Sequence, residues 1–490
     1  MLGRKTLLLN PPLVGGIAFT RQGRCQERED VLGTTKPPYT LALLAALLRD
    51  KGCDVRLVDA TAQRLSIEDV MGRLDRDGFV PSLIVFPSTT PTLDADVAQV
   101  ARLKARYGAP IFCFGPHAST VPAAAMARVP DVDGMFVGEP EDAVLQLAGL
   151  ESLEGMTGIP SLTCRPQGAA GAVVPHRAHG SFSGFLTMPY PAWDLVSLKD
   201  YALPLVDKPY VMVETSRGCP YSCDFCVAPI HQGHKFRERT PKALVDEIER
   251  IHREHGTEFF YLWGDTVTLN VKSFTAFCDE LIARKLPIQW FGNARADNLT
   301  DPAFVHRLRR AGCWMLALGV ESESDEMRKD MAKRLEGKKI QAAFRNMREA
   351  GIRSFAFFIF GYPGETLSTI EQTINYAIEL DPDFANFYPA VPYPGTALHE
   401  KVVREGLLPP RADSDWARLE YSYYVLEGNG LNHQVMMDAI NRAKRRFFLR
   451  PTYLARHVGD MTRLATSKWQ VAWQIGARMV LGTRATDGRP

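Results

Sequence analysis

Arg217-Gly218-Cys219-Pro220-Tyr221-Ser222-Cys223-Asp224-Phe225-Cys226 brings three cysteines together, directly after the apolar, strand-like run Tyr210–Thr215. Thiolates this close can hold one metal centre. A structural zinc site uses four protein ligands and closes its coordination sphere, whereas a four-iron cluster held by three thiolates leaves one iron open to a small molecule. The other cysteines lie singly and far away, and no His pair has metal-ligand spacing. The pattern favours an iron–sulfur cluster over structural zinc or a chance grouping.

This motif, with Phe225 before its last cysteine, resembles the signature of the radical S-adenosylmethionine (radical SAM) superfamily. The resemblance implies that Cys219, Cys223 and Cys226 hold a [4Fe-4S] cluster whose open iron chelates the amino and carboxylate groups of SAM. It also implies an external one-electron reductant of the flavodoxin or ferredoxin type. The electron cleaves SAM to a 5′-deoxyadenosyl radical.

Composition indicates a globular protein of two or three domains, since 490 residues exceed the usual domain length of roughly 100–200. Hydrophobic residues make up 46% and charged residues 23%, as in ordinary globular chains. The nine cysteines form no disulfide framework, which suggests a reducing compartment. The first apolar run is too short for a signal peptide, and no run reaches the roughly 20 residues of a spanning helix. We expect a cytoplasmic protein.

Residues 1–150 alternate short apolar runs with helical patterns, which predicts a doubly wound parallel sheet of Rossmann-like type. Ligands of such sheets bind in the loops at the carboxyl ends of the strands. No G-x-G-x-x-G follows the first strand, which disfavours a nicotinamide or flavin dinucleotide. The expected strands are Thr6–Asn10, Asp54–Asp59, Ser82–Pro87, Pro110–Phe114 and Gly134–Val137, and the expected helices are Tyr39–Lys51, Ile67–Arg76, Leu93–Tyr107 and Asp142–Leu150.

Ahead of a radical SAM motif, this sheet resembles the cobalamin-binding domain of the cobalamin-dependent radical SAM enzymes. The chain has no Asp-x-His-x-x-Gly motif, so the resemblance implies base-off cobalamin without a His ligand. A sheet that has lost its cofactor is the alternative, and His117 could equally be an ordinary loop hydrogen-bonder. The residues expected to contact cobalamin are Asn10, Pro11, Ser88, Thr89, Gly115, His117, Gly138 and Glu139.

Residues 151–205 are rich in Gly and Pro, so we expect a semi-rigid connector with a small hairpin at Ser161–Cys164 and Ala172–Pro175. Trp193 is expected to be a packing anchor.

Residues 206–405 resume the alternation with six strands and five intervening helices, and this pattern resembles the partial (β/α)6 barrel of the superfamily. The expected strands are Tyr210–Thr215, Glu258–Trp263, Pro287–Asn293, Met315–Val320, Ser354–Phe360 and Phe384–Pro389. The expected helices are Pro241–His255, Lys272–Lys285, Pro302–Ala311, Lys338–Ala350 and Leu367–Leu380.

Polar residues and glycines follow these strands, where the chemistry of such barrels is located. The resemblance implies that Asp265 meets the SAM ammonium group and that Arg295 meets its carboxylate as a fork. Each carboxylate could instead cap the helix that follows, which is our expectation for Glu365. The full set expected to bind SAM is Phe225, Gly264, Asp265, Arg295, Glu321, Gly361 and Pro363.

Residues 406–490 form an expected helical region with a basic end, since eleven Lys and Arg stand against two Asp from Asn441 onward. Lys468–Leu481 has helical periodicity with a broad apolar face. A helix docked on the barrel and an interfacial helix on anionic membrane are both compatible with this pattern. No recognised nucleic-acid-binding module accompanies the charge, so we expect no nucleic-acid partner.

Together, the resemblances imply a cobalamin-dependent radical SAM enzyme. We expect a methyltransferase that acts on an unactivated carbon of a small, hydrophobic molecule with two SAM per turnover, one supplying the methyl group through cobalamin and one the radical. One alternative keeps both cofactors without methyl transfer, as in tetrapyrrole cyclisation, ring contraction or oxidation. Another is a non-catalytic cobalamin or cluster sensor. The sequence identifies neither the substrate nor a catalytic side chain.

Overall fold

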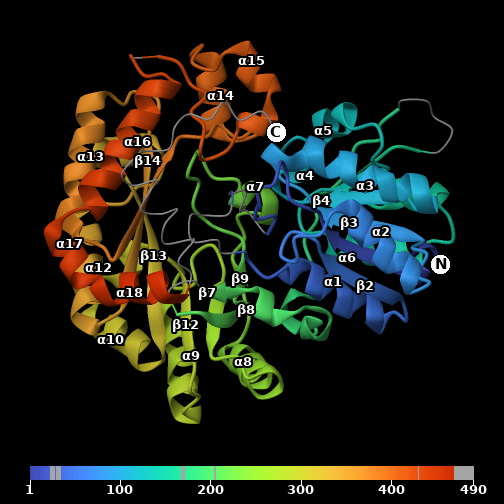
Figure 1. The fold of residues 1–490 in the computed structure, drawn as a ribbon, viewed down its shortest axis with the longest axis horizontal. Coiled ribbons are helices and arrows are strands. Elements are labelled where there is room, and N and C mark those ends of the chain that lie inside the picture. The colour runs from blue at the N-terminus through green and yellow to red at the C-terminus, as the bar shows by residue number, and fades with distance from the viewer. Residues whose placement is uncertain (23–27, 29–34, 167–171, 204–205, 429, 468–490) are drawn as a thin grey trace.

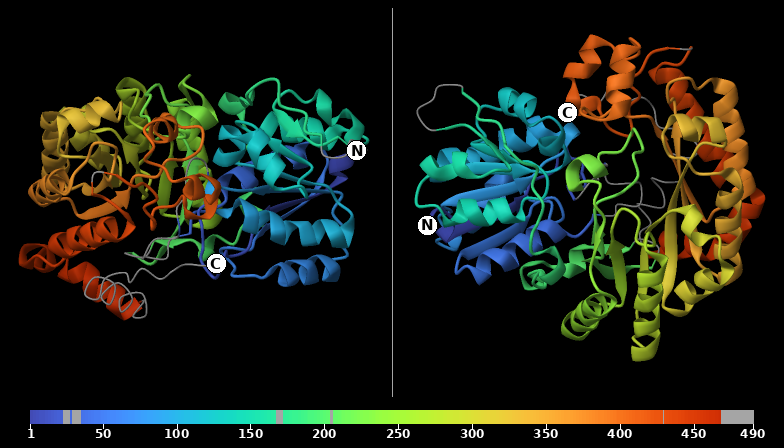
Figure 2. Two further views of the ribbon diagram at one scale, coloured as in Figure 1. Left: turned by 90° about the horizontal axis from the view of Figure 1, so that it is seen from above. Right: turned by 180° about the vertical axis from the view of Figure 1, so that it is seen from behind.

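The computed structural model describes residues 1–22, 28, 35–166, 172–203, 206–428 and 430–467. Two α/β units lie side by side, and a helical C-terminal region packs over the second (Figure 1, Figure 2). The predicted fold class is confirmed: an N-terminal parallel sheet precedes a curled half-barrel and a helical end. Among these residues, no helix is both long and apolar enough to cross a membrane.

The first sheet has the strand order β2-β1-β3-β4-β5-β6. Strands β1 to β5 are parallel, as predicted, and β6 joins the edge in the antiparallel direction. The chain order reverses between β1 and β3, which is where ligands of doubly wound sheets usually bind. The strands are β1 (Lys5–Asn10), β2 (Asp54–Asp59), β3 (Leu83–Pro87), β4 (Ile111–Phe114), β5 (Gly134–Phe136) and β6 (Leu162–Cys164). The helices are α1 (Tyr39–Asp50), α2 (Ile67–Arg76), α3 (Leu93–Tyr107), α4 (Pro116–Thr120), α5 (Pro122–Arg128) and α6 (Glu141–Gly149).

The expected hairpin exists, because Cys164 of β6 exchanges backbone hydrogen bonds with Val174. Through β6 it extends the first sheet past residue 150. Trp193 is buried, as expected of a packing anchor. The short helices here are η3 (Leu153–Gly158), η4 (Phe185–Thr187), η5 (Trp193–Leu195) and η6 (Leu198–Asp200).

The second sheet has the order β15-β14-β13-β12-β11-β8-β7. Six parallel strands confirm the predicted half-barrel, and β7 adds an antiparallel edge. Its strands are β7 (Ala202–Leu203), β8 (Lys208–Glu214), β11 (Phe259–Trp263), β12 (Gln289–Ala294), β13 (Cys313–Glu321), β14 (Arg353–Phe360) and β15 (Phe384–Pro389). Its helices are α8 (Pro241–His255), α9 (Val271–Arg284), α10 (Pro302–Arg310), α11 (Asp325–Asp330), α12 (Gly337–Ala350) and α13 (Leu367–Leu380).

The two faces of the barrel sheet differ in burial. Along β14 and β15, fully buried residues alternate with half-buried ones. The buried face packs against the helices, of which α10, α12 and α13 lie on the side away from the first unit (Figure 1). The strand registers place a row of mostly half-buried aromatic rings on the other, concave face: Tyr261, Phe291, Phe355, Phe357, Phe384 and Tyr388.

The C-terminal region docks on the barrel through ion pairs. Arg442 and Arg446 pair with Glu371, and Arg450 and Arg456 pair with Asp381. These ion pairs hold residues 442–456 on the barrel. The predicted helix Lys468–Leu481 lies outside the described residues. The helices are α14 (Ala397–Arg404), α15 (Pro410–Ser414), η8 (Trp416–Arg418), α16 (His433–Phe448), α17 (Pro451–Arg456) and α18 (Val458–Ser467).

Candidate functional site

The cysteine loop follows the carboxyl end of β8 and the short strand β9 (Ser216–Arg217), which pairs with β10 (Arg237–Glu238). Cys219, Cys223 and Cys226 are all half-buried. Gly218 has a φ of +80°, and a Cβ there would overlap the Lys235 carbonyl, so only glycine permits this turn. The cysteines therefore lie where this type of barrel places its reacting groups.

The donor set fits an iron–sulfur cluster, because one loop supplies three thiols and cations lie beside it. Burial raises the pKa of the Cys223 thiol, and the charges of Lys333 and Arg295 oppose that rise. The Arg295 guanidinium also lies 3.8 Å from the centre of the Tyr221 ring, within the loop. Positive charge next to the cysteines suits thiolate ligands and the carboxylate of SAM.

Arg295 follows β12 and is buried beside the cysteine loop, and its contact with SAM stays a prediction. Its guanidinium donates hydrogen bonds to Asp297 at 3.2 Å and to the Lys333 carbonyl at 3.0 Å. These bonds hold the fork in place.

Glu321 ends β13 at a bulge, with a φ of +67° that few non-glycine residues adopt. Its carboxylate accepts a hydrogen bond of 2.8 Å from Lys333, and both side chains are nearly buried. A Cβ at Gly319 would overlap this carboxylate. The absence of a side chain at Gly319 therefore leaves room for the pair of Glu321 and Lys333. Sequence reasoning missed Lys333, which no motif marks.

Gly264 and Asp265 follow β11 and lie against the strand that leads to the cysteines. A Cβ at Gly264 would overlap the hydroxyl oxygens of Thr215 and Ser216. The Thr215 backbone N–H donates to the Trp263 carbonyl at 2.7 Å. Glycine here lets the two strand ends converge, and the contact of Asp265 with SAM stays a prediction.

The loop after β14 touches both the cysteine loop and the C-terminal region. Tyr362 donates a short hydrogen bond to Asp224, which lies between two of the cysteines. Gly361 has a φ of +77°, and its Cβ position points at Tyr424 and Met436 of the C-terminal region. The glycine is therefore required by this packing, and its contact with adenine stays a prediction.

Glu365, Pro363 and Phe225 also lie in the part of the structure around the cysteine loop and the loop after β14. The expectation that Glu365 caps helix α13 is wrong, because Thr366 caps it through a reciprocal pair with Thr369. Glu365 instead accepts the Gly361 backbone N–H. Pro363 is buried in the same loop, and Phe225 is half-buried against the core.

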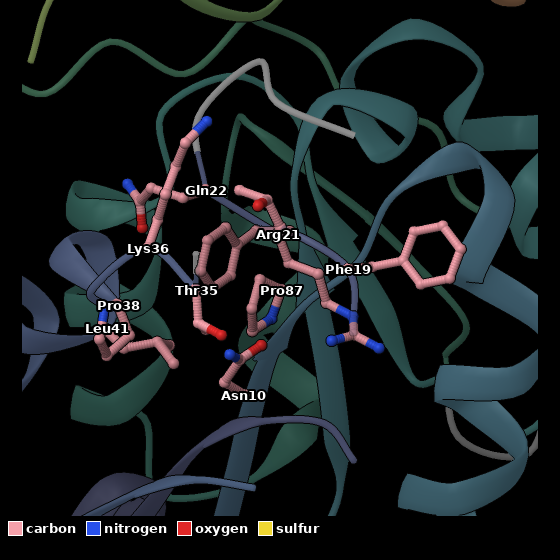
Figure 3. A pocket seen from close by; sticks show the side chains of 11 residues that line it. Asn10, Phe19, Arg21, Gln22, Thr35, Lys36, Pro38, Leu41 and Pro87 are labelled. Carbon is pink, nitrogen blue, oxygen red and sulfur yellow. The ribbon is translucent and has the colours of Figure 1, made fainter. Parts of the chain in front are cut away.

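The carboxyl edge of the first sheet carries the polar side chains expected there, and Figure 3 shows the small cavity that Asn10 lines. Asn10 donates to Asp59 at 2.9 Å, while its Oδ1 is buried without a partner. Ser88 donates to Asp96 at 3.0 Å, and the Pro11 carbonyl accepts from Thr61 at 2.6 Å. Thr89 is also buried at this edge.

This edge fits cobalamin in chemistry, because the peripheral amides of a corrin can donate to an unpaired oxygen such as Asn10 Oδ1. Two small cavities lie at this edge, with about 320 and about 380 Å³ of empty space that includes open solvent. Arg21 covers the edge and pairs with Asp96 at 2.7 Å.

Two of the predicted cobalamin contacts serve backbone packing. A Cβ at Gly115 would overlap the Ser88 carbonyl, and one at Gly138 would overlap the Gly180 carbonyl. Both glycines have positive φ, so they allow close approach of neighbouring loops.

His117 lies on α4 rather than in a loop. Its ring packs edge-on against Trp416 at 4.3 Å, and Nδ1 lies 3.1 Å from the Thr90 hydroxyl. Burial lowers the pKa of His117 to about 3, so the ring is neutral. The Nε2 atom is buried without a partner. His117 therefore contacts the C-terminal region through Trp416, and its contact with cobalamin stays a prediction.

Glu139 joins the two units. Its carboxylate pairs with Arg217 at 3.0 Å and with Arg237, and it accepts the Phe182 backbone N–H at 2.7 Å. Glu141 pairs with Arg217 at 2.7 Å. Both carboxylates are buried. Sequence reasoning placed Glu139 at cobalamin, and that role stays a prediction.

Comparison with known families matches both units. The Radical SAM superfamily matches residues 213–377, and the B12 binding domain matches residues 30–148.

Two relatives cover most of the chain. An uncharacterised methyltransferase of Pyrococcus horikoshii is 27% identical over 93% of this chain and 94% of its own length. An anaerobic magnesium-protoporphyrin IX monomethyl ester cyclase of Cereibacter sphaeroides is 26% identical over 86% of this chain and 68% of its own length.

Solved structures share the fold. The radical SAM methyltransferase TsrM of Kitasatospora setae, with cobalamin and a [4Fe-4S] cluster bound, has a TM-score of 0.67 at 19% identity, covering 90% of this chain and 91% of that one. The cobalamin-dependent radical enzyme OxsB has a TM-score of 0.68 at 15% identity, covering 98% and 76%. With a B12-binding unit joined to a radical SAM half-barrel, this chain belongs to the radical SAM superfamily as a cobalamin-binding enzyme that uses a [4Fe-4S] cluster, SAM and cobalamin.

Proposed function

We propose that this enzyme transfers a methyl group to an unactivated carbon of a hydrophobic small molecule. The observation that supports this most is the buried contact between the cysteine loop and the carboxyl edge of the first sheet, through Arg217 and Glu139. When bound, the cluster with SAM supplies a 5′-deoxyadenosyl radical, and cobalamin supplies the methyl group. A radical is needed because no side chain is basic enough to deprotonate such a carbon.

The residues at the strand ends bind and orient rather than react. Arg295 offers a charged fork for a carboxylate, and Asp265 and Glu321 offer acceptors for an ammonium group. Lys333 holds Glu321 in place. These residues would thereby hold SAM at a fixed distance from the substrate carbon, which loses a hydrogen and gains the methyl group.

The concave face of the barrel supports a hydrophobic substrate. Phe355 and Phe357 stack at 4.8 Å, and Tyr261 and Phe291 stack at 4.8 Å. Two amides on this face, Asn293 and Asn386, each donate to a neighbouring tyrosine hydroxyl, Tyr261 and Tyr388 respectively. Aromatic rings with satisfied polar groups favour an apolar, flat ligand.

The second candidate keeps both cofactors without methyl transfer. The similarity to a magnesium-protoporphyrin cyclase over 86% of this chain favours it. Products separate the two reactions, because methyl transfer yields S-adenosylhomocysteine and the alternative yields 5′-deoxyadenosine without it.

The test uses reconstituted enzyme, a reductant and SAM labelled in its methyl group, with an apolar extract as the substrate source. The proposal predicts labelled product, S-adenosylhomocysteine and 5′-deoxyadenosine in equal amounts. Deoxyadenosine with an unlabelled, altered product and no S-adenosylhomocysteine would instead establish the alternative.

A further inference from the structure

The cysteine loop is attached to the first unit on both of its sides. Arg217 precedes Cys219 by two residues, and His231 follows Cys226 by five. Each contacts the carboxyl edge of the first sheet. The cluster-bearing segment is therefore held between two contacts that cross the same interface.

The contact before the cysteines is a buried ion network. Arg217 donates to Glu139 at 3.0 Å, to Glu141 at 2.7 Å and to Glu214 at 2.9 Å, and its side chain is 3% exposed. Glu139 and Glu141 come from the end of β5 and the start of α6, whereas Glu214 ends β8. One guanidinium thus joins the two units at the point where the cluster loop begins.

The contact after the cysteines is a hydrogen bond. His231, on α7 (Ala228–Gln232), lies with Nδ1 2.9 Å from the Ser119 hydroxyl on α4. The Ser119 hydroxyl donates to the Gly115 carbonyl at 2.9 Å and accepts the Gly138 N–H at 3.0 Å. Both partners are buried. His231 is therefore tied to the ends of β4 and β5 together.

Stability alone does not account for this arrangement, since apolar residues of equal volume usually stabilise an interface as well as a buried ion network does. The planar guanidinium of Arg217 instead fixes the orientation of the cysteine loop on the first unit, because its N–H groups point at different carboxylates. The two contacts also flank the segment that holds Cys219, Cys223 and Cys226.

We propose that Arg217 and His231 are positioning residues that set the distance and orientation between the iron–sulfur cluster and cobalamin. They do so by holding the cluster loop on the cofactor edge of the first unit. This assignment does not depend on methyl transfer, because a cyclase with the same two cofactors needs the same geometry.

The test compares Arg217→Lys with Arg239→Lys. Lysine keeps the charge but cannot reach several carboxylates in a fork. Arg239 is a matched control, because it is equally buried and its pair with Glu247 lies within the barrel. Each holoenzyme carries cob(II)alamin and a reduced cluster, and pulsed electron paramagnetic resonance measures the dipolar coupling of the two spins.

The proposal expects a shifted or at least about twofold broader distance distribution in Arg217→Lys and an unchanged one in Arg239→Lys. Cobalt and iron content should match the wild type in both. Formation of the reaction product, whether methylated or cyclised, should fall by about tenfold or more, because misplacement by about 1 Å can cost about 100-fold in rate. An unchanged coupling in a fully loaded Arg217→Lys enzyme would overturn the role of Arg217.

A second pair of variants decides the case if Arg217→Lys does not load its cofactors. His231→Asn keeps a polar group near the position of Nδ1, whereas His231→Leu removes it. The proposal expects the wild-type coupling in the first and an altered coupling in the second. Equal, wild-type couplings in both would contradict a positioning role for the loop contacts.

Discussion

Lys333 donates a 2.8 Å hydrogen bond to Glu321, and this ion pair joins the end of β13 to the turn after α11, beside Cys223. The Lys333 side chain is 11% exposed and that of Glu321 is 6% exposed. A buried carboxylate held by one cation can face the ammonium group of a ligand without moving. The pair is thus well placed to prepare the SAM site before SAM arrives.

Replacement of Lys333 by Met should weaken SAM binding by about tenfold or more, because breaking a buried ion pair typically costs about 3–5 kcal/mol and leaves Glu321 without its anchor. The spectrum of the reduced cluster, titrated with SAM, measures this affinity. Lys339→Met is the control, since its pair with Glu336 is largely exposed. Wild-type affinity in a Lys333→Met enzyme with full iron content would show that the pair does not prepare the site.

Replacement of Cys223 by Ala should abolish the brown cluster absorption and the formation of 5′-deoxyadenosine, because two thiolates cannot hold the cluster that three hold. Cys278→Ala is the control, since Cys278 is a buried cysteine on α9, outside the cysteine loop. It should retain both signals. Residual cluster and deoxyadenosine in Cys223→Ala would refute the assignment of the cluster ligands.

The regular elements were predictable because local signals agree with the tertiary contacts. Helix α2 has a capping box at Ser66, and α3 ends at Gly108 in the left-handed region. Helices α4 and α5 were missed because Gly115-Pro116 and Val121-Pro122 resemble loop sequence. Each Pro stands at the first position of its helix, which is a signal that could have revealed them.

Contacts that depend on the assembled fold were not predictable. Lys333 reaches Glu321 through a turn in which Ala332 and Arg334 have positive φ, a conformation that nothing in the local sequence requires. Arg217 meets Glu141 across 76 residues of chain. By contrast, the proximity of Arg295 to the cysteines was predictable, because one loop and one neighbouring strand end place them.

Glu365 should make stability depend on pH. Its Oε1 is buried without a partner, and burial raises its pKa from 4.5 to about 8, against the weaker effect of the Gly361 and Tyr362 N–H groups. An acid with a raised pKa binds its proton more tightly in the folded state. Between these two pH values the folded state holds more protons than the unfolded state. Stability therefore falls as pH rises, by up to about 1.4 kcal/mol per pH unit.

Glu365→Gln should remove this part of the slope and leave the protein more stable than the wild type near the upper end of that range. The difference between the two denaturation midpoints, measured across the range, isolates Glu365 from other titrating groups. Glu349→Gln, at an exposed position on α12, is the control and should parallel the wild type. A constant difference between wild type and Glu365→Gln would mean that Glu365 does not titrate here.

Asp381 tests the docking of the C-terminal region. It caps α13 in the left-handed region, with a φ of +48°, and accepts hydrogen bonds from Arg450 and Arg456. Burial alone would raise the pKa of Asp381. The two guanidinium groups outweigh this effect and hold the pKa below its usual value. The stabilisation is therefore present above the usual pKa of an aspartate and is lost as pH falls through the lowered one.

Asp381→Asn should lower the free energy of unfolding by about 1 kcal/mol at neutral pH, since each partly exposed pair contributes about 0.2–1 kcal/mol. Asparagine tolerates the left-handed conformation, so the helix end itself should persist. Proteolysis should then cleave within α17 faster than in the wild type, and the difference should vanish in acid. Glu379→Gln, an exposed neighbour on α13, should change neither quantity. Equal cleavage of Asp381→Asn and wild type would show that packing of Phe447 and Tyr453, rather than these ion pairs, holds the region on the barrel.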